Sequence, residues 1–138
     1  MASFDQLRRR VQAELFAGMP EHIGRLHWSA DQIAARQQRD LRSLLAHAVE
    51  HAPFHARRLR HIDPESFELG RLAELPVMTK AGLMAHFDDI VTDRRLTLAL
   101  AERALAATAM VPVPLFDRYV CVASGGSSGV RGVFVSDA

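Results

Sequence analysis

The chain has 138 residues, of which 49% are hydrophobic, and its 17 lysines and arginines nearly balance its 16 acidic residues. This size and composition can bury the core of one domain, which excludes a disordered protein. A net charge of +1 provides no field that would hold DNA, RNA or an acidic membrane, so we expect neither nucleic acid nor membrane among the partners.

Three further features predict a cytoplasmic protein. The single cysteine, Cys121, cannot form an internal disulfide. The polar residues that follow Met1 are unlike the apolar core of a secretory leader. No apolar run approaches the roughly 20 residues that a membrane-spanning helix needs.

Helical spacing dominates residues 1–109. Apolar residues recur on one face from Phe4 to Leu15, which predicts a helix over residues 4–17 that Gly18 and Pro20 terminate. Ser29 and Gln32 have the spacing of a capping box, and the helix they begin is expected to run until Pro53 interrupts it. Three shorter helices are predicted to begin at Pro53, Lys80 and Leu98.

The pattern changes in residues 110–138. Residues 119–123 (Tyr-Val-Cys-Val-Ala) form a β-branched and aromatic run of strand length, and residues 133–135 form a second one. The predicted fold class is therefore α/β, with a mainly helical region (1–109) followed by a β-hairpin (110–138). A lone hairpin is marginally stable in water unless a sheet or helices cover it.

The segment between these two runs, residues 124–129, reads Ser-Gly-Gly-Ser-Ser-Gly. Its glycines let backbone N–H groups converge on one anion, its serines add hydroxyl donors, and Arg131 adds a permanent positive charge. The alternative is a flexible serine-glycine turn between two strands. The Walker pattern is excluded because no lysine follows Lys80, and the dinucleotide pattern Gly-x-Gly-x-x-Gly is absent. The candidate phosphate ligands are Ser124, Gly125, Gly126, Ser127, Ser128, Gly129 and Arg131.

This segment resembles the ATP-phosphate loop of the adenylate-forming ligases, the acyl-CoA synthetase superfamily. It is most similar to the loop of phenylacetate-coenzyme A ligase-like proteins. Two earlier segments resemble the same subfamily, in the same order along the chain: His47-Ala48 with Pro53-Phe54-His55, and residues 75–80 (Leu-Pro-Val-Met-Thr-Lys). The resemblance covers residues from about 40 to 138. It departs from the common pattern at Gly125, where that pattern has serine, at Arg131, where it has proline, and at Gly132, where it has lysine.

The resemblance implies an enzyme that joins a carboxylic acid to the α-phosphate of ATP with Mg²⁺ and then transfers the acyl group to coenzyme A. It implies that residues 1–138 are part of that enzyme's N-terminal domain, that they supply the phosphate loop, and that they are inactive alone, because the family's adenine site, magnesium glutamate and catalytic lysine lie beyond the loop. The remainder of the ligase or a second copy of the chain is the expected protein partner. The alternative is a non-catalytic helical remnant or interaction module that retains the ligase fold.

Other residues favour structural roles. His47, His51 and His55 are spaced by four, as zinc ligands on a helix would be, but Pro53 interrupts that helix and no metal site is predicted. Arg57, Arg58, Arg60 and His61 are interpreted as a solvated helix face. Cys121 lies within an apolar strand and is predicted to be buried and unreactive.

Overall fold

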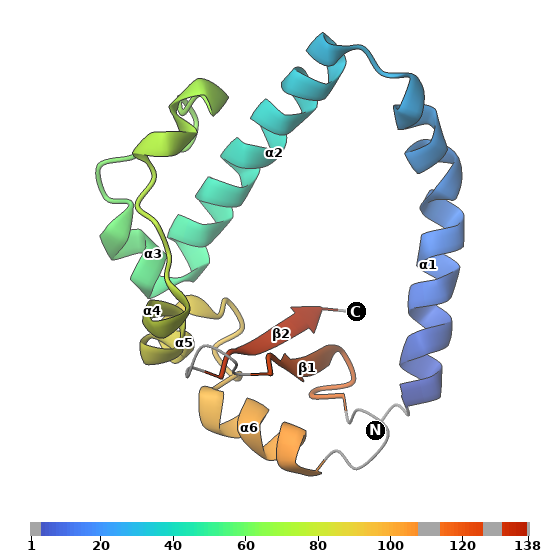
Figure 1. Cartoon of the computed structure of the whole chain (residues 1–138), viewed down its shortest axis with the longest axis vertical. Coiled ribbons are helices and arrows are strands. Elements are labelled where there is room, and N and C mark those ends of the chain that lie inside the picture. The colour runs from blue at the N-terminus through green and yellow to red at the C-terminus, as the bar shows by residue number, and fades with distance from the viewer. Residues whose placement is uncertain (1–3, 108–113, 126–130, 138) are drawn as a thin grey trace. The chain divides into compact units, whose positions relative to one another are not determined.

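The computed structural model describes residues 4–107, 114–125 and 131–137 (Figure 1). The chain forms two compact units, one made of Met1–Arg25 with Leu96–Ala138 and the other of Leu26–Arg95. Helices precede a two-stranded antiparallel hairpin, which is the broad α/β order predicted from the sequence. Within the described residues, no helix combines the length and the apolar character needed to span a bilayer.

The first unit begins with α1 (Phe4–Gly24). This helix is longer than predicted, because it continues through Gly18 and Pro20 instead of ending there. A proline inside a helix removes one N–H donor, here the donor to the carbonyl of Phe16. Phe16 is 70% exposed, so water can hydrate that carbonyl. The helix then continues, and an exposed ion pair between Glu21 and Arg25 links its last turn to η1 (Arg25–His27).

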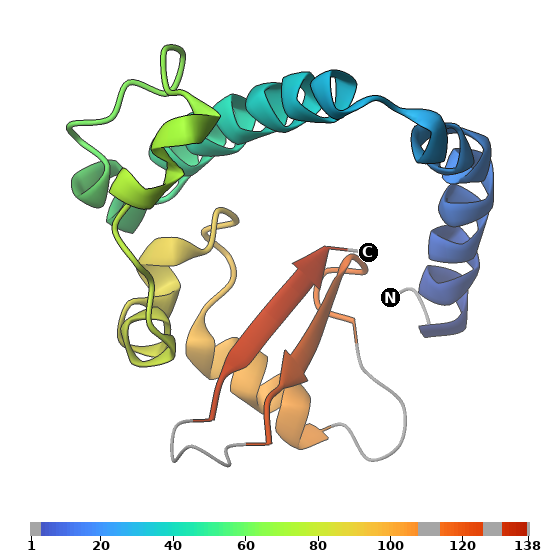
Figure 2. The same ribbon diagram turned by 45° about the horizontal axis from the view of Figure 1, so that its top comes forward.

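The hairpin consists of β1 (Tyr119–Ala123) and β2 (Val133–Asp137), and α6 (Leu98–Ala107) packs against both strands (Figure 2). Alternate residues of β1 point toward the core, so Tyr119 and Cys121 are buried while Val122 is half exposed. Small buried residues of α6, Ala101 and Ala104, allow the helix to approach the sheet closely. Burial raises the pKa of the Cys121 thiol. The predicted burial of this cysteine is therefore confirmed, and a raised thiol pKa disfavours the reactive thiolate.

The second unit is built on α2 (Ala30–His51), whose predicted capping box is present: the N–H of Gln32 donates to the hydroxyl of Ser29, and the N–H of Ser29 donates to the side-chain oxygen of Gln32. The remaining elements are short: α3 (Pro53–Arg58), η2 (Leu69–Glu74), α4 (Lys80–Ala85) and α5 (Phe87–Ile90). Pro53 occupies the first turn of α3, and the Thr79 side chain caps α4. Both features were predicted.

A small core holds the irregular stretch after α3 against α2. Leu45, Leu59 and Phe67 form its buried centre. Two side chains of α2 also hold the backbone at Phe67, because Gln38 Nε2 and Arg42 Nε donate to its carbonyl at 2.6 and 3.0 Å. These bonds pair a carbonyl that a buried, non-helical segment would otherwise leave unsatisfied.

Candidate functional site

The candidate site is the segment that joins β1 to β2. The strand ladder ends at the pair Ala123 and Val133, and one further residue pair closes the neck of the loop. The N–H of Ser124 donates to the carbonyl of Gly132 at 2.8 Å, and the N–H of Gly132 donates to Ser124 Oγ at 2.9 Å. We name these two residues the neck pair. They fix both ends of the loop on the sheet that α6 supports.

Ser124 therefore has a structural role in addition to its predicted role as a phosphate ligand. Its hydroxyl oxygen accepts the Gly132 N–H, while a hydroxyl can also donate its own proton. The predicted phosphate ligand is thus positioned by the neck, with its oxygen oriented toward the opposite strand. The sequence pattern identified the residue type but contained no signal for this bracing contact.

Gly132 is where the resemblance lacks the family's lysine, and its surroundings provide a physical reason. A Cβ atom placed on Gly132 would lie 2.9 Å from Cε2 of Phe134 and 3.2 Å from Ser124 Oγ. Such distances are shorter than ordinary carbon contacts. A side chain at this position would have to displace the Phe134 ring, and Phe134 is a residue that sequence reasoning did not connect with the site.

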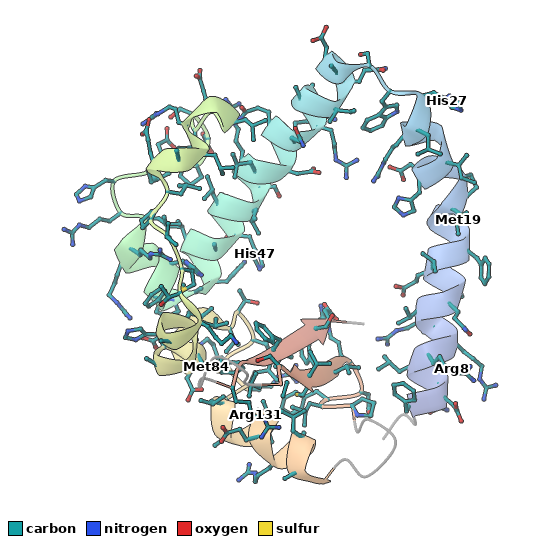
Figure 3. The ribbon with its side chains drawn as sticks, viewed as in Figure 1. Arg8, Met19, His27, His47, Met84 and Arg131 are labelled. Carbon is teal, nitrogen blue, oxygen red and sulfur yellow. The ribbon has the colours of Figure 1, made fainter. Side chains whose placement is uncertain are left out.

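Arg131, labelled in Figure 3, directly precedes Gly132 of the neck pair in the sequence, and it is exposed. Among the residues that the structure describes, no carboxylate pairs with it. The arginine at the other end of the hairpin differs, because Arg118 forms a two-point ion pair with Asp137, with one of its bonds at 2.6 Å. The positive charge near the loop is thus available to an external anion, whereas the charge of Arg118 is neutralised within the sheet.

Gly125, the first residue of the loop, is exposed, and none of the described residues beyond its chain neighbours comes within 4 Å of the position that a Cβ would take. The other four candidate ligands, Gly126, Ser127, Ser128 and Gly129, lie outside the described residues. The described part of the loop fits a phosphate-binding loop in two respects: its ends are anchored by the neck pair, and Arg131 supplies a positive charge.

The two other segments that carry the resemblance lie together in the second unit. Arg58 of α3 donates to the carbonyl of Val77, and its guanidinium lies 5.7 Å from the centre of the Phe54 ring. A cavity of about 240 Å³ next to this contact is lined by residues of both segments, including His55, Leu75 and Pro76. Burial, and then the charge of Arg58, lower the pKa of His55.

These contacts correct one interpretation of the arginine cluster. Arg58 is half-buried and braces the Leu75–Met78 stretch, so it does not belong to a solvated face. Arg57 is exposed but contacts Asp89 of α5 at 2.6 Å. The sequence pattern placed Arg57 and Arg58 on one helix correctly, but Arg60 and His61 follow the end of α3 at Arg58. The pattern also held no signal for the distant carbonyl and carboxylate that pair with Arg58 and Arg57.

The histidines do not form a metal centre within the described part of the chain. His47 and His51 lie in α2 with their rings 4.4 Å apart, edge to face, while His55 follows the break at Pro53. No group of three or more histidine, cysteine or acidic side chains in the described residues is arranged to hold a metal ion.

Comparison of this chain with protein-family models, with curated proteins and with solved structures found no match.

Proposed function

We propose that the segment between β1 and β2 is the ATP-phosphate loop of an adenylate-forming ligase, and that this chain is the N-terminal part of such an enzyme, similar to phenylacetate-coenzyme A ligase-like proteins. The observation that carries the proposal is the anchored loop: a glycine-serine segment whose ends are held by the neck pair, Ser124 and Gly132, with exposed Arg131 beside it. Anchored ends limit the ordering that the loop must undergo when it binds an anion.

In the proposed reaction, a carboxylate oxygen attacks the α-phosphorus of ATP, the bond to pyrophosphate breaks, and an acyl-adenylate forms. The thiol of coenzyme A then attacks the acyl carbon and AMP leaves. Bound Mg²⁺ neutralises phosphate charge in such a reaction. In this reaction the chain contributes the groups that hold the outer phosphates of ATP: backbone N–H groups, serine hydroxyls and Arg131. These groups offset negative charge as pyrophosphate leaves. We assign none of its residues to Mg²⁺ or coenzyme A.

Calorimetric titration of the purified chain with Mg-ATP tests the proposal. We expect weak binding that the double variant Ser127→Ala/Ser128→Ala abolishes and that Arg131→Ala weakens by at least about tenfold, since a charged hydrogen bond is lost. Two matched controls are Ser136→Ala in β2 and Arg103→Ala on α6, which remove the same groups from exposed positions elsewhere in the unit. Both controls should bind like the original chain.

Absence of binding at millimolar Mg-ATP would contradict the proposal and favour the non-catalytic interaction module. We further propose that the chain alone does not complete adenylation, and we expect no acid-dependent exchange of pyrophosphate into ATP. A measurable acid-dependent rate would contradict that second statement while leaving the loop's role intact. The balanced charge and the single cysteine also support a cytoplasmic location.

A further inference from the structure

The cavity of about 240 Å³ in the second unit has an aliphatic lining. It lies where α3 packs beside the last turns of α2 (Figure 1). Two of its lining residues, Leu45 and Leu59, are buried members of the core, whereas Leu44 is 63% exposed and marks the open side. Leu75 and Pro76 line it from the stretch that precedes α4. At the packing density of protein interiors, such a space holds roughly ten non-hydrogen atoms, which is the size of a small organic molecule.

Arg58 lines this cavity and is half-buried, but no acidic side chain in the described part of the chain pairs with it. Its guanidinium contacts the Val77 carbonyl, the Met78 sulfur and the face of the Phe54 ring, all of which are uncharged. Val77 directly follows Pro76 of the cavity wall, so the positive charge lies at that edge of the cavity. A guanidinium has five N–H donors, and these contacts use two of them. A partly desolvated cation of this kind is stabilised by an anion.

His55 lines the same cavity and is also half-buried. Its ring contacts the Phe54 ring edge to face, with the centroids 5.5 Å apart, and neither of its nitrogens has a hydrogen-bond partner among the described residues. Burial, and then the charge of Arg58, lower the pKa of His55, so the imidazole is neutral near pH 7 and one nitrogen carries a donor proton. A guanidinium and a neutral imidazole beside one aliphatic cavity are complementary to a carboxylate with an aliphatic body.

We propose that this cavity binds a small aliphatic carboxylate of about eight carbons, whose chain fills the aliphatic space and whose carboxylate accepts hydrogen bonds from Arg58 and His55. The carboxylate supplies the anion that Arg58 lacks within the described residues, and the chain covers apolar surface that is open at Leu44. The cavity belongs wholly to the second unit, whereas the segment between β1 and β2 belongs to the first. This inference does not depend on the proposed ligase function.

A ¹H–¹⁵N NMR titration of the full chain with octanoate tests the proposal, with octanamide as the matched ligand of similar shape and no charge. We expect octanoate to bind at least about tenfold more tightly than octanamide, because octanamide offers Arg58 no negative charge. The amide shifts should concentrate in residues 44–48, 55–59 and 75. Equal affinities, no binding of octanoate at millimolar concentration, or shifts confined to other segments would overturn the proposal. Tighter binding of N-acetylleucine than of octanoate would assign the cavity to the C-terminus of a peptide and would also overturn it.

Variants test the charge and the space separately. Arg58→Gln removes the charge but retains an amide donor for the Val77 carbonyl, and it should abolish the preference for octanoate over octanamide. Ala48→Leu fills the cavity from α2 and should weaken octanoate binding by at least about tenfold. The matched control is Ala46→Leu, at an exposed position of the same helix outside the cavity lining, and it should bind octanoate like the original chain. An unchanged preference in Arg58→Gln, or equal effects of the two leucine variants, would overturn the proposal.

Discussion

Replacing Gly132 with alanine tests the packing that holds the neck of the loop. The added Cβ would lie 2.9 and 3.0 Å from two carbons of the Phe134 ring. Favourable carbon contacts begin at about 3.5 Å, so the ring has to move by roughly half an ångström or more. Overpacking of this kind costs about 1–3 kcal/mol. Because Phe134 is 41% exposed, its ring has room to shift, and the lower end of that range applies.

The size of the change in unfolding free energy caused by Gly132→Ala should depend on Phe134. Alanine in place of glycine restricts the unfolded chain and stabilises the folded one by about 0.5 kcal/mol where the backbone tolerates it. We therefore expect Gly132→Ala to lower the free energy of unfolding by about 1 kcal/mol in the original chain. In a Phe134→Ala background the ring is gone and only the 3.2 Å approach to Ser124 Oγ remains, so the same substitution should cost clearly less. The two positions should therefore be coupled by at least about 0.5 kcal/mol.

Urea unfolding followed by tyrosine fluorescence measures this coupling locally. Tyr119 is the only tyrosine and lies in β1, whereas the only tryptophan, Trp28, lies in the second unit. A Trp28→Phe background leaves Tyr119 as the sole emitter and reports on the hairpin. An equal cost of Gly132→Ala with and without the Phe134 ring would refute the reasoning.

Three further predictions concern the second unit, and Trp28 fluorescence during urea unfolding measures each. Burial, and then the charge of Arg58, lower the pKa of His55 in the folded state, so the unfolded state binds the proton more tightly. The stability of the unit should therefore fall as the pH drops below about 6.5. His55→Gln should reduce this pH dependence. A hydrogen bond from Arg57 lowers the pKa of Asp89, so this contact stabilises the fold above the ordinary aspartate pKa of about 3.9 and is lost as the pH falls below it. Asp89→Asn should therefore lower the stability of the unit at neutral pH. The variant should also lose less stability than the original chain when the pH falls below that value. Arg58→Ala should cost about 1–2 kcal/mol, because it removes both the bond to the Val77 carbonyl and the packing on Phe54, whereas the control Arg60→Ala should change stability by less than about 0.5 kcal/mol. The His55 prediction is contradicted if His55→Gln leaves the pH profile of stability unchanged. The Asp89 prediction is contradicted if Asp89→Asn loses as much stability in acid as the original chain. The Arg58 prediction is contradicted if Arg58→Ala and Arg60→Ala have equal effects.

Local signals in the sequence predicted the local structure well. The capping box at Ser29, the proline at the start of α3 and the threonine cap of α4 each depend on residues within four positions of one another. The strands were predicted for the same reason, since β-branched and aromatic residues are concentrated in two short runs. Pro20 was misjudged because its penalty depends on whether water reaches the freed carbonyl, which is a property of the surroundings rather than of the sequence window.

The contacts of the candidate site are long-range, and no sequence window contains them. Residue types and glycine spacing pointed to Ser124 and Arg131. The neck pair, by contrast, joins positions eight residues apart across the hairpin. The ring of Phe134 over Gly132 and the reach of Arg58 to Val77 depend on how the backbone folds back on itself. The grouping of α1 with the hairpin in one compact unit is also a tertiary property, joining the two ends of the chain.

The most direct test of the account is a ¹H–¹⁵N NMR titration of the chain with Mg-ATP, with adenosine as the matched ligand that lacks phosphates. The phosphate-loop account predicts amide shifts concentrated between Ser124 and Gly132, reproduced by Mg-pyrophosphate and absent with adenosine. Shifts spread elsewhere with the loop amides unmoved, or the same loop shifts with adenosine, would contradict it.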